Sequence, residues 1–378
     1  MSARISQKAY MSISNQLPKN RTSKTISDFL SLLRLGTNHS VSSSLVDVDW
    51  KALQNLADEQ GLSAVVLDGV EKLSGQQRPP KAFLLEWIGE TLQGYEYRYE
   101  LYLRAIAELA CFYSSHGYKM MILKGYACSL DWPKPEHRPC GDIDIWLFGK
   151  QKEADAILEE EKGVEIDSSR HHHHTVFYWC DFMVENHCDF VSVHDYQSSV
   201  AIEEVFKELG DDDTNSVEVY GEKLYLPSPN LHSLFLLRHT LNHFASIGIS
   251  LRQVLDWAFF VEKHTKEIDW RWLNEMLEKF YMKDFFGCIN AICVEDLGFD
   301  ASIFHGVKFN PALKDRVLRE ILNPEYGNDL PKYLIPRLMF KLKRWRGSEW
   351  KRELCFNENG CLSFWKNLWR HILKPKSI

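Results

Sequence analysis

The chain has 378 residues, of which 45% are hydrophobic and 26% are charged, and its net charge at pH 7 is −7. Its length exceeds one compact core, so two or three domains are expected, and its composition is that of an ordinary globular protein. The negative charge argues against binding of nucleic acid over the whole surface but leaves room for a local basic patch. The sequence contains no run of about 18 apolar residues, so a membrane span is not expected.

The N-terminal third is predicted to be helical after a polar start. Residues 1–24 lack the apolar stretch of a secretory signal, so we expect a flexible tail there. Asp49 is placed to cap the start of a helix. A long helix is expected over about 82–115, with one break near Gly94. Residues 25–115 are therefore predicted to form a helical N-terminal region.

The pattern then changes to short strands and turns, which predicts an α/β core over 116–230. Strands are expected over 118–123, 142–148, 175–180 and 182–191, and helices over 126–130 and 151–161. From about Leu231 onward helical spacing returns, so 231–378 is predicted to be a helical C-terminal region. The predicted fold class is α+β, with a small mixed β-sheet core between two helical regions.

Two carboxylates in the predicted strand over 142–148 are the first candidates for chemistry. Residues i and i+2 of a strand point to the same face, so Asp142 and Asp144 are side by side while Ile143 and Ile145 point into the core. Adjacent carboxylates repel each other unless a cation lies between them. Mg²⁺ binds a few carboxylates together with substrate phosphates and water, and two such ions can clamp a phosphoryl transfer.

An Asp-x-Asp pair alone is equally typical of a solvated strand face, so its neighbours decide the interpretation. Lys124-Gly125 follows a strand and opens a helix, where a phosphate can approach the backbone N–H groups. Arg138 precedes the pair and is a candidate phosphate clamp. Glu185, on a later strand, offers a third carboxylate. Together these neighbours favour a two-metal site for phosphoryl chemistry.

The combination resembles the polymerase-beta-like nucleotidyltransferase superfamily, and more narrowly its bacterial uncharacterised nucleotidyltransferase branch. The resemblance extends roughly from Phe29 to Trp257. It rests on three segments: Leu123-Lys124-Gly125, Arg138-Pro139-Cys140-Gly141-Asp142-Ile143-Asp144 and Val184-Glu185-Asn186-His187. The chain departs from the wider superfamily at Tyr126, where a small residue that would hold a terminal phosphate is expected.

The resemblance implies a transferase that moves a nucleoside monophosphate from a nucleoside triphosphate to a hydroxyl of a small molecule, sugar or protein. Asp142, Asp144 and Glu185 would bind Mg²⁺ or Mn²⁺ and carry catalysis. Asp189, at i+4 from Glu185, is the competing third carboxylate. Nucleotide-binding roles are expected for Lys124, Gly125, Arg138, Gly141 and His187. The alternative is a non-catalytic nucleotide-binding or regulatory interaction protein, against which the intact carboxylates speak.

Other histidines and ion-pair candidates receive structural interpretations. The run His171–His174 is interpreted as a strand lead-in or as substrate contacts in preference to a metal site. His239 and His243 share one helical face and are assigned to core packing or hydrogen bonding. Arg252 and Asp256, also four apart, are predicted to form a helix-stabilising salt bridge, with a structural pair near the cleft as the alternative that the resemblance implies.

The cysteines and the C-terminus complete the predictions. Nine scattered cysteines without a Cys-x-x-Cys pair predict reduced thiols in a cytoplasmic protein and no cysteine-bound zinc. Cys140, between proline and glycine, is interpreted as a turn residue and not a nucleophile. The basic, tryptophan-rich stretch 337–378 is interpreted as a helical subdomain, with contact to nucleic acid or an anionic membrane as the alternative.

Overall fold

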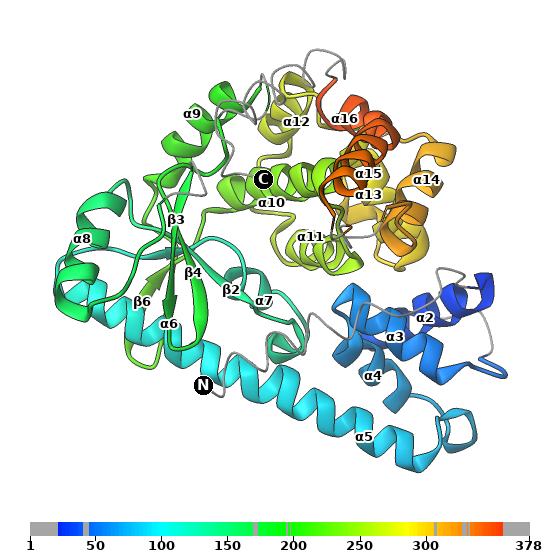
Figure 1. The fold of residues 1–378 in the computed structure, drawn as a ribbon. Helices are drawn as coiled ribbons and strands as arrows, with labels where there is room; N and C mark the ends of the chain where they lie inside the picture. Colours follow the sequence, from blue (N-terminus) through cyan, green and yellow to red (C-terminus); the bar gives the residue numbers. More distant parts are fainter. Residues whose placement is uncertain are drawn as a thin grey trace.

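A computed structural model of the chain describes residues 22–357 except 41–44, 169–172, 194, 195, 197, 306, 307, 327–330 and 332. The described chain forms a mixed β-sheet with helices on both faces and further helices packed beyond one face (Figure 1). The predicted α+β fold class is therefore confirmed. The predicted N-terminal tail lies outside the described residues apart from 22–24.

The described residues form a six-stranded sheet in the order β3-β4-β2-β1-β6-β5. The strands are β1 Met121–Ile122, β2 Asp142–Trp146, β3 His174–Trp179, β4 Phe182–His187, β5 Ser216–Val219 and β6 Glu222–Tyr225. β2 is parallel to β4 and β1 is parallel to β6, while the other neighbouring pairs are antiparallel. The hairpins β3–β4 and β5–β6 each turn through two residues with positive φ, which matches the twist of their strands.

The two faces of β2 lie against different layers of the protein. Ile143 and Ile145 are fully buried in a cluster with α6, Arg98–Ser115, and α8, Gln151–Lys162. Trp146, on the opposite face, belongs to a second cluster with α9, Ser199–Gly210, and α10, Pro229–Ser246. Asp142 and Asp144 alternate with the two isoleucines, so they lie on the α10 side of the sheet.

The N-terminal helices are joined to the sheet by one long helical rod (Figure 1). They are α2 Ser23–Gly36, α3 Trp50–Gln60, α4 Ser63–Glu71, η2 Gly75–Gln77 and α5 Lys81–Thr91. Asp49 caps α3 as predicted, because its carboxylate accepts a hydrogen bond from Ala52 N at 3.0 Å. The break predicted near Gly94 is instead a π-helical segment, η3 Leu92–Tyr97, that joins α5 to α6 without ending the helix.

Helices from the two ends of the chain share one core. The C-terminal elements after α10 are α11 Leu251–His264, α12 Trp270–Lys279, α13 Lys283–Ala291, η5 Ile292–Asp296, η6 Ala301–Ile303, α14 Pro311–Leu322, α15 Leu334–Gly347 and α16 Glu349–Phe356. The side chain of Gln60 accepts a hydrogen bond from Leu251 N at 2.8 Å and donates one to Ile321 O at 3.2 Å. These bonds tie α3 to α11 and α14.

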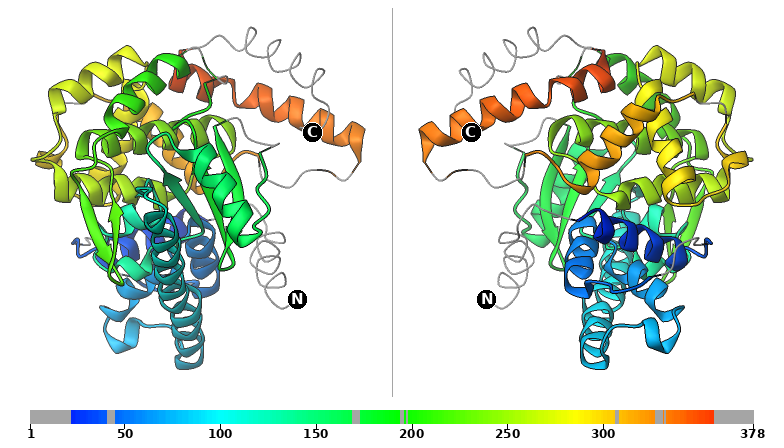
Figure 2. Two further views of the ribbon diagram at one scale, coloured as in Figure 1. Left: turned by 90° about the vertical axis from the view of Figure 1, so that its left-hand side faces the viewer. Right: turned by 90° about the vertical axis from the view of Figure 1, so that its right-hand side faces the viewer.

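The described part of the basic C-terminus is helical. Trp350 is half-buried and packs edge-on against Phe244 at 5.7 Å between ring centroids, as expected for a core tryptophan. Figure 2 shows α15 extending away from the rest of the described chain. Residues 358–378, which hold two further tryptophans, lie outside the described residues. Among the described helices, none has the length and apolarity needed to cross a membrane.

Three predicted strands were too long, and one hairpin was not predicted. β2 ends at Trp146, two residues before the end of the predicted strand over 142–148. β1 covers only the end of the segment 118–123. β4 ends at His187 because Phe190 N and Val191 N donate to the carboxylate of Glu203 in α9, at 3.0 and 2.9 Å, and not to a neighbouring strand. The hairpin β5–β6 and helix α9 were missed from the sequence.

Candidate functional site

The carboxylates of β2 lie at the surface of a cavity between the sheet and the C-terminal helices. The cavity has a volume of about 430 Å³. Asp142 is partly exposed to it, whereas the side chain of Asp144 is only 1% exposed. All of the residues predicted to form the site line this cavity: Lys124, Gly125, Arg138, Gly141, Asp142, Asp144, Glu185 and His187.

Glu185 reaches the aspartates through the pairing of β2 with β4. The parallel register places Glu185 beside Asp144 and Met183 beside Asp142. His187, two residues after Glu185, shares its face of β4, and its Nε2 lies 3.2 Å from Oδ1 of Asp144. The geometry favours Glu185 over Asp189, because Asp189 follows the end of the strand and its carboxylate pairs with Lys207 at 2.5 Å.

The Lys-Gly turn supports the aspartates from the neighbouring strand. Lys124 Nζ lies 2.6 Å from Oδ1 of Asp144. Gly125 has φ +42, and a Cβ there would lie 2.5 Å from the hydroxyl oxygen of Tyr102. That hydroxyl donates a hydrogen bond to the carbonyl of Asp142 at 2.9 Å. Only glycine suits this position, since both the backbone conformation and the close tyrosine exclude a side chain.

The two carboxylates nearest to Lys124 differ in their tendency to ionise. Burial alone would raise the pKa of Asp144, but the charge of Lys124 and the hydrogen bond from His187 overcome burial and lower it. Burial, and after it the negative charge of Asp144, raises the pKa of Glu185. Asp144 therefore stays ionised, while Glu185 holds a proton more readily until another cation enters.

Arg138 was predicted to bind a phosphate, but in the structure its guanidinium pairs with a carboxylate of the protein. Its Nε and Nη2 donate to the two carboxylate oxygens of Asp256 at 2.7 and 2.9 Å, and both side chains are buried. The predicted salt bridge between Arg252 and Asp256 is therefore wrong, because Asp256 is paired with Arg138. Arg252 instead donates to the carbonyl of Pro139 at 3.2 Å and lines the cavity.

The far wall of the cavity comes from α10 and α11, which the sequence did not assign to the site. His239 and His243 line the cavity with their rings 4.3 Å apart, so their assignment to core packing was incomplete. Burial, and after it the charge of Lys124, lowers the pKa of both histidines, so they are neutral at pH 7. The i, i+4 spacing predicted that both histidines lie on one face of a helix, but it did not predict that this face lines the cavity.

Two further sequence interpretations concern residues next to the site. Cys140 is buried just before Gly141, and burial raises the pKa of its thiol, which disfavours a nucleophilic thiolate. Of the four consecutive histidines, His173 and His174 line the cavity, whereas His171 and His172 lie outside the described residues.

The donor set fits a divalent cation. Asp144, Glu185 and His187 each offer a ligand atom, and these atoms lie within 4.8 Å of one another. Asp142 adds a third carboxylate at the same cavity. The positive charge of Lys124 offsets one of these carboxylates, so net negative charge remains for an incoming cation to neutralise.

No curated protein matches the chain. A solved structure, an antigenic nucleotidyltransferase-like protein from Paracoccidioides brasiliensis, is 14% identical with a TM-score of 0.33, and the match covers 54% of this chain and 97% of that one. The uncharacterised nucleotidyltransferase family matches residues 46–298. The resemblance inferred from the motifs is thereby confirmed, and the chain belongs to the uncharacterised nucleotidyltransferase family.

Proposed function

We propose that this protein transfers a nucleoside monophosphate from a nucleoside triphosphate to a hydroxyl group of an acceptor. Family membership supports a nucleotidyl-transfer role in general. The observation that carries the finer proposal is the pairing of Asp144 with Glu185 across β2 and β4, with Asp142 two residues earlier on the same face. This arrangement gathers three carboxylates at one wall of a cavity that also contains a lysine.

Asp142, Asp144 and Glu185 would hold the divalent cation, Mg²⁺ or Mn²⁺. Oxygen ligands are the ones that Mg²⁺ prefers. When bound, the ion would neutralise charge on the triphosphate and on the leaving pyrophosphate.

The residues of the chain have separate roles in the proposed reaction. Glu185, whose carboxylate is ionised once a cation is bound beside it, would orient the attacking hydroxyl and accept its proton. The hydroxyl oxygen bonds to the α-phosphorus while the bond from that phosphorus to the pyrophosphate oxygen breaks. Lys124 is the nearest ammonium to the cavity carboxylates and can move from Asp144 to a phosphate oxygen. Arg252, which also lines the cavity, replaces Arg138 as the proposed phosphate contact because Arg138 is held by Asp256.

The test measures pyrophosphate release from ATP, CTP, GTP and UTP by the purified full chain with Mg²⁺ or Mn²⁺ and fractionated cell extract. Asp142→Asn/Asp144→Asn and Glu185→Gln are expected to lower release by at least about 100-fold, because each removes charge that acts on the transition state. Asp189→Asn is the matched control, since its carboxylate pairs with Lys207 away from the cavity, and it is expected to retain activity.

Three outcomes separate the possibilities. Release that depends on Asp142, Asp144 and Glu185 supports the proposal. Equal activity in the wild type and the double asparagine variant would overturn it. Nucleotide binding without release in any extract fraction would support the alternative, a non-catalytic nucleotide-binding or regulatory protein.

A further inference from the structure

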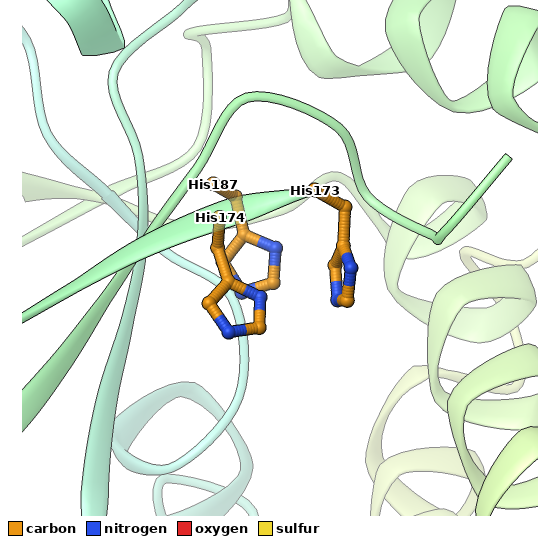
Figure 3. Close-up of side chains that lie close together, drawn as sticks. All are labelled: His173, His174 and His187. Atoms are coloured by element: carbon orange, nitrogen blue, oxygen red, sulfur yellow. The ribbon is translucent and has the colours of Figure 1, made fainter. Parts of the chain in front are cut away.

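Three imidazole rings lie close together (Figure 3), in the cavity that the carboxylates also line. They belong to His173 and His174 at the start of β3 and to His187 at the end of β4. Ring centroids lie 4.3 Å apart for His173 and His174, 5.2 Å for His174 and His187, and 5.8 Å for His173 and His187. One nitrogen from each ring lies within 4.8 Å of the others, so a small movement of the rings would bring all three nitrogens to a single ion.

The backbone holds these rings in place. His174 and His187 are directly opposite each other in the antiparallel pairing of β3 with β4. The carbonyl of His173 accepts hydrogen bonds from the N–H groups of Cys188 and Asp189, at 2.9 and 3.1 Å. All three side chains therefore project from one hydrogen-bonded strand pair and its continuation, and this limits the rearrangement needed to bind an ion.

The second partner of His187 suits a metal ligand. Its Nδ1 lies 3.1 Å from the carbonyl of Asp189, and a carbonyl only accepts, so Nδ1 carries the proton of that bond. Nε2, the ring nitrogen that faces Asp144, is then the one that can offer a lone pair to an ion. A backbone carbonyl that fixes the tautomer in this way is a recurrent support of metal-binding histidines.

We propose that His173, His174 and His187 bind a divalent transition-metal ion of the zinc class, next to the carboxylates that suit Mg²⁺. Imidazole nitrogen favours zinc and its neighbours in the transition series, whereas Mg²⁺ favours carboxylate and water oxygen. Three nitrogens with one open position form a common zinc arrangement. The carboxylate of Glu185, 3.8 Å from Nε2 of both His174 and His187, can complete it.

Burial and charge at the cluster agree with this assignment. His174 and His187 are buried, so an ion there exchanges most of its water for protein ligands. All three rings line the cavity, which gives the ion a path of entry. The imidazoles are neutral when they bind, and the nearby charges of Glu185 and Asp144 compensate the ion. This proposal concerns binding alone and does not rest on the proposed transfer reaction.

The test is a competition titration of the metal-free full chain with Zn²⁺ alone, against a chromophoric zinc chelator in excess Mg²⁺. His173→Gln/His174→Gln is expected to weaken zinc binding by at least about 100-fold, because substitution of groups that only support a ligand already costs about 10–100-fold. His171→Gln/His172→Gln is the matched control from the same histidine run. It is expected to bind zinc as the wild type does.

A loss of equal size in the control variant would overturn the proposal, because it would assign binding to the histidine run as such. Zinc-edge X-ray absorption of the wild type avoids dependence on variants that fold poorly. The spectrum is expected to show three imidazole ligands and no sulfur ligand on the zinc ion. A zinc ion with one imidazole ligand, or with a sulfur ligand, would contradict the proposed site. Asp142→Asn alone is expected to abolish the transfer reaction and to keep zinc binding, so failure of the transfer reaction and failure of this site are distinguishable.

Discussion

The ion pair between Arg138 and Asp256 supports a strong prediction about stability. It joins the loop before β2 to α11, with both side chains about 6% exposed and two hydrogen bonds of 2.7 and 2.9 Å. Asp256→Ala leaves a buried guanidinium without its counter-charge, which costs about 3–5 kcal/mol. The same carboxylate accepts a hydrogen bond from Trp132 at 2.9 Å. The double variant Arg138→Met/Asp256→Leu should therefore lose only about 1–3 kcal/mol, mainly for the unpaired indole.

Urea denaturation followed by tryptophan fluorescence measures the free energy of unfolding for each variant. Glu275→Ala is the control, because it removes an exposed ion pair with Arg271 of about 0–1 kcal/mol. The reasoning fails if Asp256→Ala costs no more than Glu275→Ala. It also fails if the double variant loses as much as the sum of Arg138→Met and Asp256→Leu.

Three further predictions concern the site itself. Gly125→Ala should lower the free energy of unfolding by about 1–3 kcal/mol, because of the positive φ of Gly125 and the close hydroxyl of Tyr102. Gly89→Ala, on an open helix face, is the control and should not lower it. Equal free energies of unfolding for the two variants would contradict this prediction. The pKa of Glu185 is raised in the folded protein, so the contribution of this carboxyl to the metal-free free energy of unfolding should fall as pH rises from about 5 to about 8. Glu185→Gln should therefore flatten the dependence of the free energy of unfolding on pH. Parallel pH profiles for the variant and the wild type would refute this expectation. Lys124→Met removes the ammonium beside the buried carboxylate of Asp144, so it should lower the melting temperature without metal. Mg²⁺ should then raise the melting temperature of this variant more than that of the wild type. An equal rise would show that the ion does not replace the ammonium.

The sequence was most informative where one strand carries both the core pattern and the chemistry. Alternation in Asp142-Ile143-Asp144-Ile145 predicts which side chains are buried and which share a face, and the structure has that arrangement. The Lys-Gly turn was likewise visible, because glycine is required where φ is positive.

The partners that depend on tertiary packing were not predictable from spacing. Asp256 is four residues from Arg252 along α11, yet it pairs with Arg138, 118 residues away, because the loop before β2 packs on that helix. Equally, the helical face that holds His239 and His243 was evident, but the cavity it lines forms only when α10 packs on the sheet.

The length of the strands also depended on distant residues. β4 appeared to continue to Val191 because the apolar pattern continues, but Glu203 of α9 takes over the backbone N–H groups there. The hairpin β5–β6 has a turn signal in Tyr220-Gly221, though its strands are only four residues long and carry few apolar side chains.

The position of the label that reaches the acceptor tests the central claim most directly. The full chain is incubated with Mg²⁺, active extract and a nucleoside triphosphate labelled at either the α- or the γ-phosphate. The proposed transfer places the α-label on the acceptor and leaves the γ-label in pyrophosphate, and both signals disappear in Asp142→Asn/Asp144→Asn. Transfer of the γ-label to the acceptor would instead identify a phosphotransferase and contradict the account.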